Sequence, residues 1–244
     1  MVLKYKNSLC IIIPAYNEDE GISSCVEKVL KETAKIKSKT LLVIVDDGSR
    51  DKTSEILKKK KHKFREKLVI LQHKKNEGYG KALQSGISYA LKNGFEFYLT
   101  MDSDLTNPPK YIHDFIRAMS DDVDCVKASR YVKGGKIIDV PIFREAISIL
   151  GNYLAALCFN VGVRDCTNGF KMVRLELLKN ISFKENNFSI ILEEMYYLKT
   201  KGARFAEIPN ILYARKSSSS HFKYKPKIFY DYFKYLLKAL ILKY

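Results

Sequence analysis

Short, continuously hydrophobic runs, separated by segments long enough for a helix, constrain the fold of this chain most strongly. Hydrophobicity at every position is typical of strands buried on both faces of a parallel sheet. Parallel neighbours need right-handed crossovers, which are usually helical. We therefore expect an α/β fold in which helices cover both faces of a mostly parallel central sheet. The runs occupy residues 9–13, 40–45, 68–71 and 95–101, where Thr40, Glu96 and Thr100 are the polar exceptions, and helices are expected to about residue 36, to about residue 64 and over 81–92.

The second half of the chain has a less regular pattern. Strands are expected over residues 123–128, 171–174 and 203–208, and helices over 143–159, 193–201 and 226–243. The last helix is amphipathic, because its apolar residues recur at spacings of one, four and five. Its apolar stripe consists of Ile228, Phe229, Tyr232, Phe233, Leu236, Leu237, Leu240 and Ile241.

The length and composition fit one large domain with a full core. The chain has 244 residues, 46% of them hydrophobic, and no internal repeat or low-complexity linker. We expect a domain over residues 1–225 and a separate amphipathic helix within 226–244. Five scattered cysteines without a C-x-x-C pair argue against a disulfide framework or a zinc site. No signal peptide and no run long enough to span a membrane are expected, so we expect a cytoplasmic protein.

The formal net charge of +16 favours a polyanionic partner, such as nucleic acid, anionic lipid or a phosphorylated substrate. Basic residues gather at 58–67, where a solvated helix end is the simpler interpretation. They gather again after residue 214, where eight Lys or Arg accompany one Asp. A nucleic-acid-binding module is the remote alternative, because no known nucleic-acid-binding signature is present.

Three polar loops follow the first, second and fourth hydrophobic runs, at residues 14–18, 46–49 and 102–104. Ligands of parallel sheets bind outside the carboxyl ends of the strands, so we expect these loops to converge on one crevice. Asp102 and Asp104 could both turn toward one hard cation there, Mg²⁺ or Mn²⁺, whose shell water and phosphate oxygens would complete. The alternative is a solvated turn in which one acid caps a helix.

The crevice also has groups that a nucleoside diphosphate would need. Asp46 and Asp47 can accept hydrogen bonds from a base or from ribose hydroxyls, and a cation at Asp102 and Asp104 can neutralise a diphosphate. The sequence has no glycine-rich phosphate loop, so metal and basic side chains would hold the phosphates. A nucleotide-sugar donor fits this combination.

Two sets of motifs resemble those of known enzymes. The first resembles inverting GT-A glycosyltransferases of the large family that includes cellulose and chitin synthases. It consists of Ile-Pro-Ala-Tyr-Asn-Glu at 13–18, Val-Asp-Asp-Gly-Ser at 45–49, Asn76-x-Gly78-x-Gly80-Lys81 and Asp102-Ser-Asp104. The second, within a resemblance that covers about residues 9–225, is similar to dolichyl- or polyprenyl-phosphate sugar synthases. It consists of Asp-Leu-x-x-Pro-Pro at 104–109, Ser-Arg-Tyr at 129–131, Arg144 with Asn152, Asp-x-x-x-Gly-Phe at 165–170, and Glu-Ile-Pro at 207–209 with Arg215.

The resemblance implies a GT-A, Rossmann-like three-layer sandwich. It also implies metal-dependent, inverting transfer of one sugar from a donor of the GDP-mannose or UDP-glucose type to dolichyl or polyprenyl phosphate. The metal would lie at Asp102 and Asp104, and the acceptor phosphate at Arg144 and Ser148, since the planar fork of arginine binds phosphate bidentately. The residues expected in catalysis are Asp104, Arg130, Arg144 and Arg215, and those expected at the nucleotide sugar are Pro14, Tyr16, Glu18, Asp46, Asp47, Lys81, Asp102, Arg130 and Arg215.

A phosphate acceptor would need no general base, because its second pKa is about 6. Glu193 and Glu194 occupy the place where related sugar-to-hydroxyl transferases keep a base, and we expect them to line the site or to be structural. The alternative that stays open is a transferase of the same superfamily acting on a polysaccharide or protein hydroxyl. The chain departs from dolichyl-phosphate mannose synthases at Thr106, where many have Gln, and we expect no C-terminal membrane spans.

The last helix suggests how the enzyme would reach a lipid acceptor. A long prenyl chain stays in the membrane, because each CH₂ transferred to water costs about 0.8 kcal/mol. A Lys-flanked amphipathic helix can bind the cytoplasmic membrane surface peripherally, and a small membrane-protein partner is another route. The alternative is that the apolar stripe packs on the domain or on another subunit.

Overall fold

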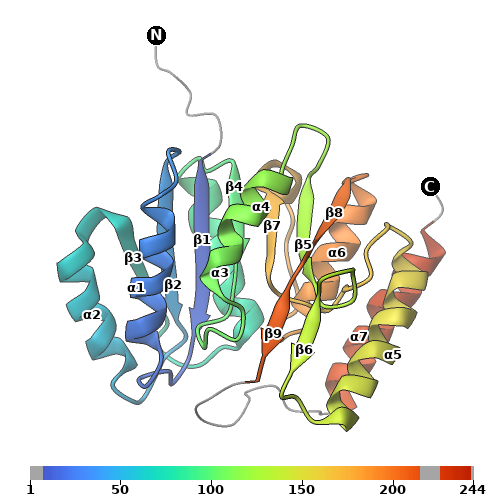
Figure 1. The fold of residues 1–244 in the computed structure, drawn as a ribbon, viewed down its shortest axis with the longest axis horizontal. Helices are drawn as coiled ribbons and strands as arrows, with labels where there is room; N and C mark the ends of the chain where they lie inside the picture. The colour runs from blue at the N-terminus through green and yellow to red at the C-terminus, as the bar shows by residue number, and fades with distance from the viewer. Residues whose placement is uncertain (1–7, 215–225, 243–244) are drawn as a thin grey trace.

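A seven-stranded sheet forms the centre of the protein (Figure 1). The computed structural model describes residues 8–214 and 226–242. The strand order is β3-β2-β1-β4-β7-β5-β8, and a separate pair, β6 and β9, is parallel. The strands are β1 (Leu9–Ala15), β2 (Thr40–Asp46), β3 (Leu68–Gln72), β4 (Phe97–Thr100), β5 (Cys125–Ser129), β6 (Lys136–Ile138), β7 (Lys171–Arg174), β8 (Phe205–Pro209) and β9 (Ile211–Tyr213).

Helices cover both faces of the sheet, which confirms the predicted three-layer α/β fold. One layer contains α1 (Ile22–Thr33), α2 (Thr53–Phe64) and α4 (Ile112–Ala118). The opposite layer contains α3 (Tyr79–Lys92) and α6 (Ile190–Thr200). Beyond the β8 end of the sheet, α5 (Ile142–Phe159) and α7 (Pro226–Ile241) lie side by side (Figure 1). Single 3₁₀ turns occur at η1 (Arg65–Lys67), η2 (Pro109–Tyr111) and η3 (Leu175–Leu178).

Strand β7 is the one antiparallel member of the large sheet. It pairs with β4 on one side and β5 on the other, with Tyr98 and Cys125 both opposite Val173. The other neighbouring strands are parallel. The predicted strand over 171–174 is confirmed, but its direction could not be read from so short a run. The other expected strands shift by one or two residues, whereas α4, β6 and β9 were not predicted.

A buried ion pair ties β7 to α6. Lys171 and Glu194 are both about 1% exposed and contact each other, and Glu194 also accepts a hydrogen bond from the Tyr98 hydroxyl. Burial raises the pKa of Tyr98, and the charge of Glu194 raises it further. A charge in such a position is tolerated only while its partner is present.

Helix α5 corrects one expectation from the sequence. Its 18 residues have a mean hydropathy of 1.4, and by length and composition the helix could cross a membrane. The expectation that no run reaches this length is therefore wrong. The two charged residues, Arg144 and Glu145, both lie in the first turn and leave a long apolar remainder. Only 17% of the helix is buried within the protein.

Helix α7 is amphipathic, as predicted, and its two faces have different surroundings. Tyr235 and Ala239 are buried in a cluster with Ala155 and Phe159 of α5. Phe229 and Leu240, by contrast, are 52% and 62% exposed. Both buried residues lie outside the predicted apolar stripe, of which Tyr232 and Leu236 pack partly against this cluster, so the packing alternative holds for only part of the stripe.

We predict that Glu194→Ala lowers the free energy of unfolding by about 3–5 kcal/mol, because it leaves the charge of Lys171 buried and uncompensated. The Glu194→Leu/Lys171→Met double variant should recover most of that stability. Urea unfolding followed by circular dichroism measures both. A single variant as stable as the wild type would show that the pair does not stabilise the fold.

Candidate functional site

A cavity of about 470 Å³ opens at the carboxyl ends of β1, β2 and β4. The three polar loops predicted from the sequence converge there. We call it the first cavity. Its lining includes the predicted residues Pro14, Tyr16, Glu18, Asp47, Asp102 and Asp104, and the unpredicted Asn76, Gly78, Tyr79, Thr106, Asn187, Phe188, Leu212 and Tyr213.

Neighbouring side chains hold the two acids that follow β4. Asp104 Oδ1 accepts hydrogen bonds from the backbone N and the hydroxyl of Thr106, at 3.0 and 2.8 Å. Asp102 Oδ2 accepts one from Asn107 Nδ2 at 3.3 Å. Asn210 Nδ2 in turn donates to Asn107 Oδ1 at 2.7 Å. Thr106, where a Gln was noted as missing, therefore orients one of the acids.

The negative charges of the acids also act together on a neighbouring thiol. Burial raises the pKa of Cys25 on α1, and the charges of Asp104, Glu18 and Asp102 raise it further. No group of three or more His, Cys, Asp or Glu in the described residues could hold a metal alone. Two carboxylates on one cavity wall nevertheless suit Mg²⁺ or Mn²⁺, which take the remaining oxygens from water and substrate phosphates.

The carboxylates of Asp46 and Asp47 both hold neighbouring parts of the chain, and only Asp47 also lines the first cavity. Asp46 is fully buried, accepts a hydrogen bond from Ser49 N at 3.0 Å and contacts the Ser54 hydroxyl. It is absent from the lining of the cavity. Asp47 Oδ2 accepts a hydrogen bond from Gly78 N at 2.8 Å, and Asp47 Oδ1 accepts one from Glu77 N at 2.9 Å. Asp47 thus positions the loop before α3.

A second cavity, of about 640 Å³, adjoins the first. The predicted Arg130, Arg144 and Ser148 all line it, together with Glu145. Apolar side chains of α5 and α7 form a large part of the remaining wall. The two cavities share Tyr79, Asp102, Phe188 and Leu212.

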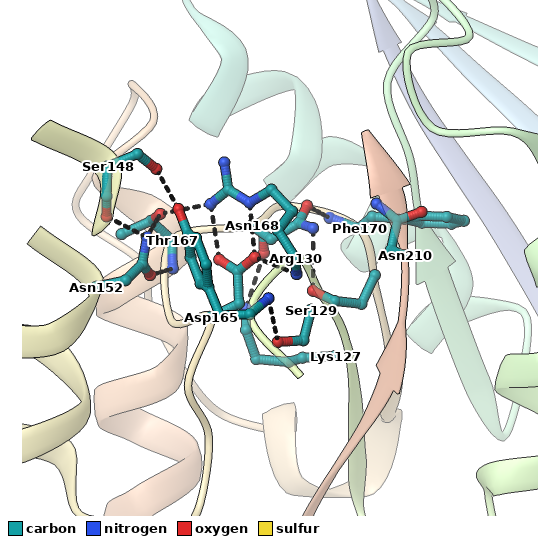
Figure 2. Close-up of polar contacts among 12 residues, drawn as sticks. Lys127, Ser129, Arg130, Ser148, Asn152, Asp165, Thr167, Asn168, Phe170 and Asn210 are labelled. Carbon is teal, nitrogen blue, oxygen red and sulfur yellow. Dashed lines mark hydrogen bonds and ion pairs between the residues drawn. The ribbon is translucent and has the colours of Figure 1, made fainter. Parts of the chain in front are cut away.

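Asp165 holds the side chain of Arg130 through two hydrogen bonds (Figure 2). Its Nε and Nη2 donate to the two oxygens of Asp165, both at 2.7 Å. Asp165 is fully buried, and Thr167 Oγ1 links Arg130 to Asn152 of α5. Burial alone would lower the pKa of Arg130, but the charge of Asp165 outweighs it and raises the pKa. Figure 2 shows the remaining guanidinium nitrogen pointing away from Asp165.

The remaining predicted residues lie elsewhere. Lys81 is in the first turn of α3 and lines neither cavity. Glu193 accepts hydrogen bonds from the backbone N of Lys184 and Glu185, so like Glu194 it is buried and structural. Arg215 lies outside the described residues. The predicted binding roles of Lys81 and Arg215 stay predictions.

Three lining residues of chemical interest were missed by the sequence analysis. Tyr79 and Phe188 are aromatic residues at helix starts, where a core position is the ordinary expectation. Glu145 directly follows Arg144. This neighbouring position was the signal that could have placed Glu145 at the second cavity.

Most of the chain matches the model of a known protein family. The sequence profile described as Glycosyl transferase family 2 matches residues 10–182. The chain is 28% identical over 234 residues to the dolichol-phosphate mannosyltransferase of Pyrococcus furiosus, covering 94% of this chain and 63% of that protein. It is also 28% identical over 171 residues to the polyprenol monophosphomannose synthase of Mycolicibacterium smegmatis, covering 70% of this chain and 63% of the other. The chain thus spans less than two thirds of either protein.

Among solved structures, glucosyl-3-phosphoglycerate synthase from Mycobacterium tuberculosis, in complex with Mn²⁺, UDP and glucosyl-3-phosphoglycerate, superimposes with a TM-score of 0.70. The match covers 99% of this chain and 82% of that one, at 16% identity. Another structure of the same synthase contains Mg²⁺ and UDP. At this identity the likeness concerns the fold, and it confirms the predicted GT-A class.

We predict that Asp104→Asn weakens Mn²⁺ binding in the presence of UDP or GDP by about tenfold or more, since it removes one charged oxygen ligand. Titration calorimetry measures the affinity. Asp114→Asn, on the exposed side of α4, is the matched control and should bind Mn²⁺ as the wild type does. Unchanged binding by Asp104→Asn would remove this residue from the metal site.

Proposed function

The chain belongs to glycosyl transferase family 2, and we propose that it moves one sugar from a nucleotide-sugar donor to the phosphate of a dolichyl or polyprenyl phosphate. The observation that carries the proposal is the pair of adjoining cavities. One is lined by carboxylates, and the other combines two arginines with an apolar wall. Asp102 belongs to both, so a donor and an acceptor could meet beside it.

The first cavity suits the donor. Tyr16 and Pro14 offer apolar surface for a base, and Asp102 and Asp104 would hold Mg²⁺ or Mn²⁺ at the diphosphate. The metal, when bound, would neutralise charge on the departing diphosphate. Structures of glucosyl-3-phosphoglycerate synthase hold Mn²⁺ and UDP-glucose, which supports this class of donor. The base and the sugar stay open between the GDP-mannose and UDP-glucose types.

The second cavity suits the acceptor. Arg130, Arg144 and Ser148 would bind its phosphate, and the apolar cleft between α5 and α7 would take the first prenyl units. The relatives from Pyrococcus furiosus and Mycolicibacterium smegmatis are named for dolichol and polyprenol acceptors, which favours the same class here.

The reaction follows from this placement. An acceptor phosphate oxygen attacks the anomeric carbon as the bond from that carbon to the donor diphosphate breaks, which inverts the configuration. The products are a prenyl phosphate sugar and a nucleoside diphosphate. The acceptor is largely dianionic at neutral pH, with a second pKa of about 6, so no proton has to be removed. The chain's own residues align the two substrates, which is the main task left to them.

We place the enzyme at the cytoplasmic face of a membrane. Of the fourteen large apolar side chains that are exposed in the described residues, all but Tyr213 lie on α5 and α7. Lys227 and Lys238 are exposed on α7. An apolar surface bordered by lysines suits anionic lipid, and the acceptor cleft lies between the two helices.

Glu145 favours the second candidate function, transfer to a sugar or protein hydroxyl. A hydroxyl acceptor needs a general base, and Glu145 is a carboxylate that lines the second cavity. It also lies in the first turn of α5, where a negative charge stabilises the helix without any catalytic role.

We predict that Arg144→Ala lowers kcat/KM for polyprenyl phosphate by about tenfold or more, roughly 1.4 kcal/mol of transition-state stabilisation. Glu145→Gln should change it by less than about threefold, because a phosphate acceptor needs no base. Steady-state transfer from GDP-mannose and UDP-glucose is the measurement.

The opposite result, a large loss with Glu145→Gln and transfer to a glycan hydroxyl but not to polyprenyl phosphate, would support the second candidate. Wild-type protein that binds neither GDP nor UDP with Mn²⁺ would contradict both.

We also predict that the double variant Leu150→Asp/Leu157→Asp on α5 lowers binding to anionic vesicles by about tenfold or more. Each leucine that inserts into the membrane contributes about 2 kcal/mol to binding. Both residues are exposed and neither lines a cavity. Co-sedimentation measures the binding. Asn93→Asp, which adds a negative charge at the end of α3, is the control. Equal sedimentation of all three proteins would exclude α5 from the membrane contact.

A further inference from the structure

Two aromatic rings lie where the two cavities adjoin. Tyr79 and Phe188 stack with their ring centroids 4.6 Å apart and their planes 16° from parallel. Both residues line both cavities. A group that passes from a donor in the first cavity to an acceptor in the second would move beside this stack and the other two shared residues, Asp102 and Leu212.

Backbone contacts fix the stack in place. Tyr79 is the first residue of α3, and the Gly80 N donates to the Asn186 carbonyl at 2.8 Å, just before Phe188. The preceding Gly78 has a φ of +103°, and a Cβ there would lie 2.3 Å from the same carbonyl oxygen. Only glycine allows the two segments to approach this closely.

The segment that carries Phe188 is anchored on its other side as well. The Glu193 carboxylate accepts hydrogen bonds from the backbone N of Lys184 and Glu185. The Glu185 side chain pairs with Lys234 of α7 and accepts hydrogen bonds from the hydroxyls of Tyr235 and Ser189. The ring of Phe188 is therefore presented by a braced loop.

The stack offers both kinds of contact that a hexose needs. Aromatic faces attract the C–H groups of one side of a pyranose ring, through burial and through their negative quadrupole. The Tyr79 hydroxyl lies beside Gly169, where an added Cβ would come within 2.9 Å of it, at the edge of the second cavity. Burial, and then the charge of Asp102, raise the pKa of Tyr79.

We propose that Tyr79 and Phe188 form the platform on which the transferred hexose lies, and that they determine which epimer the enzyme accepts. The proposal rests on the proposed function, because it assumes a sugar at the junction of the cavities. Phe188 supplies the stacking face, and Tyr79 adds a hydroxyl that distinguishes the orientation of a sugar hydroxyl. A site built to hydrogen-bond a hydroxyl discriminates far more strongly than an apolar wall does.

The test separates sugar recognition from nucleotide recognition. Phe188→Leu should raise the KM for the nucleotide sugar and lower kcat/KM by about tenfold, while the affinity for free GDP or UDP with Mn²⁺ stays unchanged. Tyr79→Phe keeps the ring and should reduce the preference between epimers by about tenfold or more. The epimer pairs are GDP-mannose with GDP-glucose and UDP-glucose with UDP-galactose.

Phe183→Leu is the matched control. Phe183 belongs to the same stretch of chain and contacts Tyr197, but it lines neither cavity. It should leave the KM and the epimer preference at wild-type values, and thermal unfolding of all three variants detects any loss of fold.

Wild-type protein that binds neither nucleoside diphosphate would overturn the proposed function together with this inference. Wild-type protein that binds and transfers, with both variants keeping the wild-type KM and epimer preference, would overturn the platform alone. A fall in nucleotide affinity equal to the fall in kcat/KM for Phe188→Leu would also overturn it, since the ring would then support the base rather than the sugar.

Discussion

The ion pair between Arg130 and Asp165 joins parts of the protein that are far apart in the sequence. Asp165 holds Arg130 at the end of β5, and its backbone N donates to Glu207 of β8. Thr167 extends the link to Asn152, and so to α5. A buried charge pair is stable only when each polar group is satisfied, which makes this geometry hard to vary. This contact therefore helps to hold α5, which supplies part of the wall of the second cavity.

The hydrophobic runs were enough to predict the layers and the location of the site. Continuous apolar runs at residues 9–13 and 40–45 indicate strands buried on both faces, and parallel strands bring their carboxyl ends to one edge. The meeting of Arg144 and Ser148 follows from their spacing of four on one helix. These inferences succeeded because periodicity and strand direction determine them locally.

Other features depend on contacts that no local pattern contains. Asp46 looked like a ligand-binding acid, but its carboxylate is used by Ser49 and Ser54 beneath the loop. The stack of Tyr79 on Phe188 joins the starts of two helices, and each residue alone reads as core. The sequence indicates which interactions an aromatic or acidic side chain is able to make. The packing of distant elements decides which of these interactions it makes.

The single antiparallel strand has a consequence for how the chain folds. Strand β7 is the only neighbour that joins β4 to β5, so the sheet is continuous only after Tyr98 and Cys125 have both come opposite Val173. The units from β1 to β4 are linked by local crossovers, whereas β7 must close a long loop, and loop closure is paid in entropy before any contact forms. Strands β1 to β4 can therefore pair before β5 and β8 join the sheet. The four residues of β7, among them the buried Lys171, hold the two parts of the sheet together.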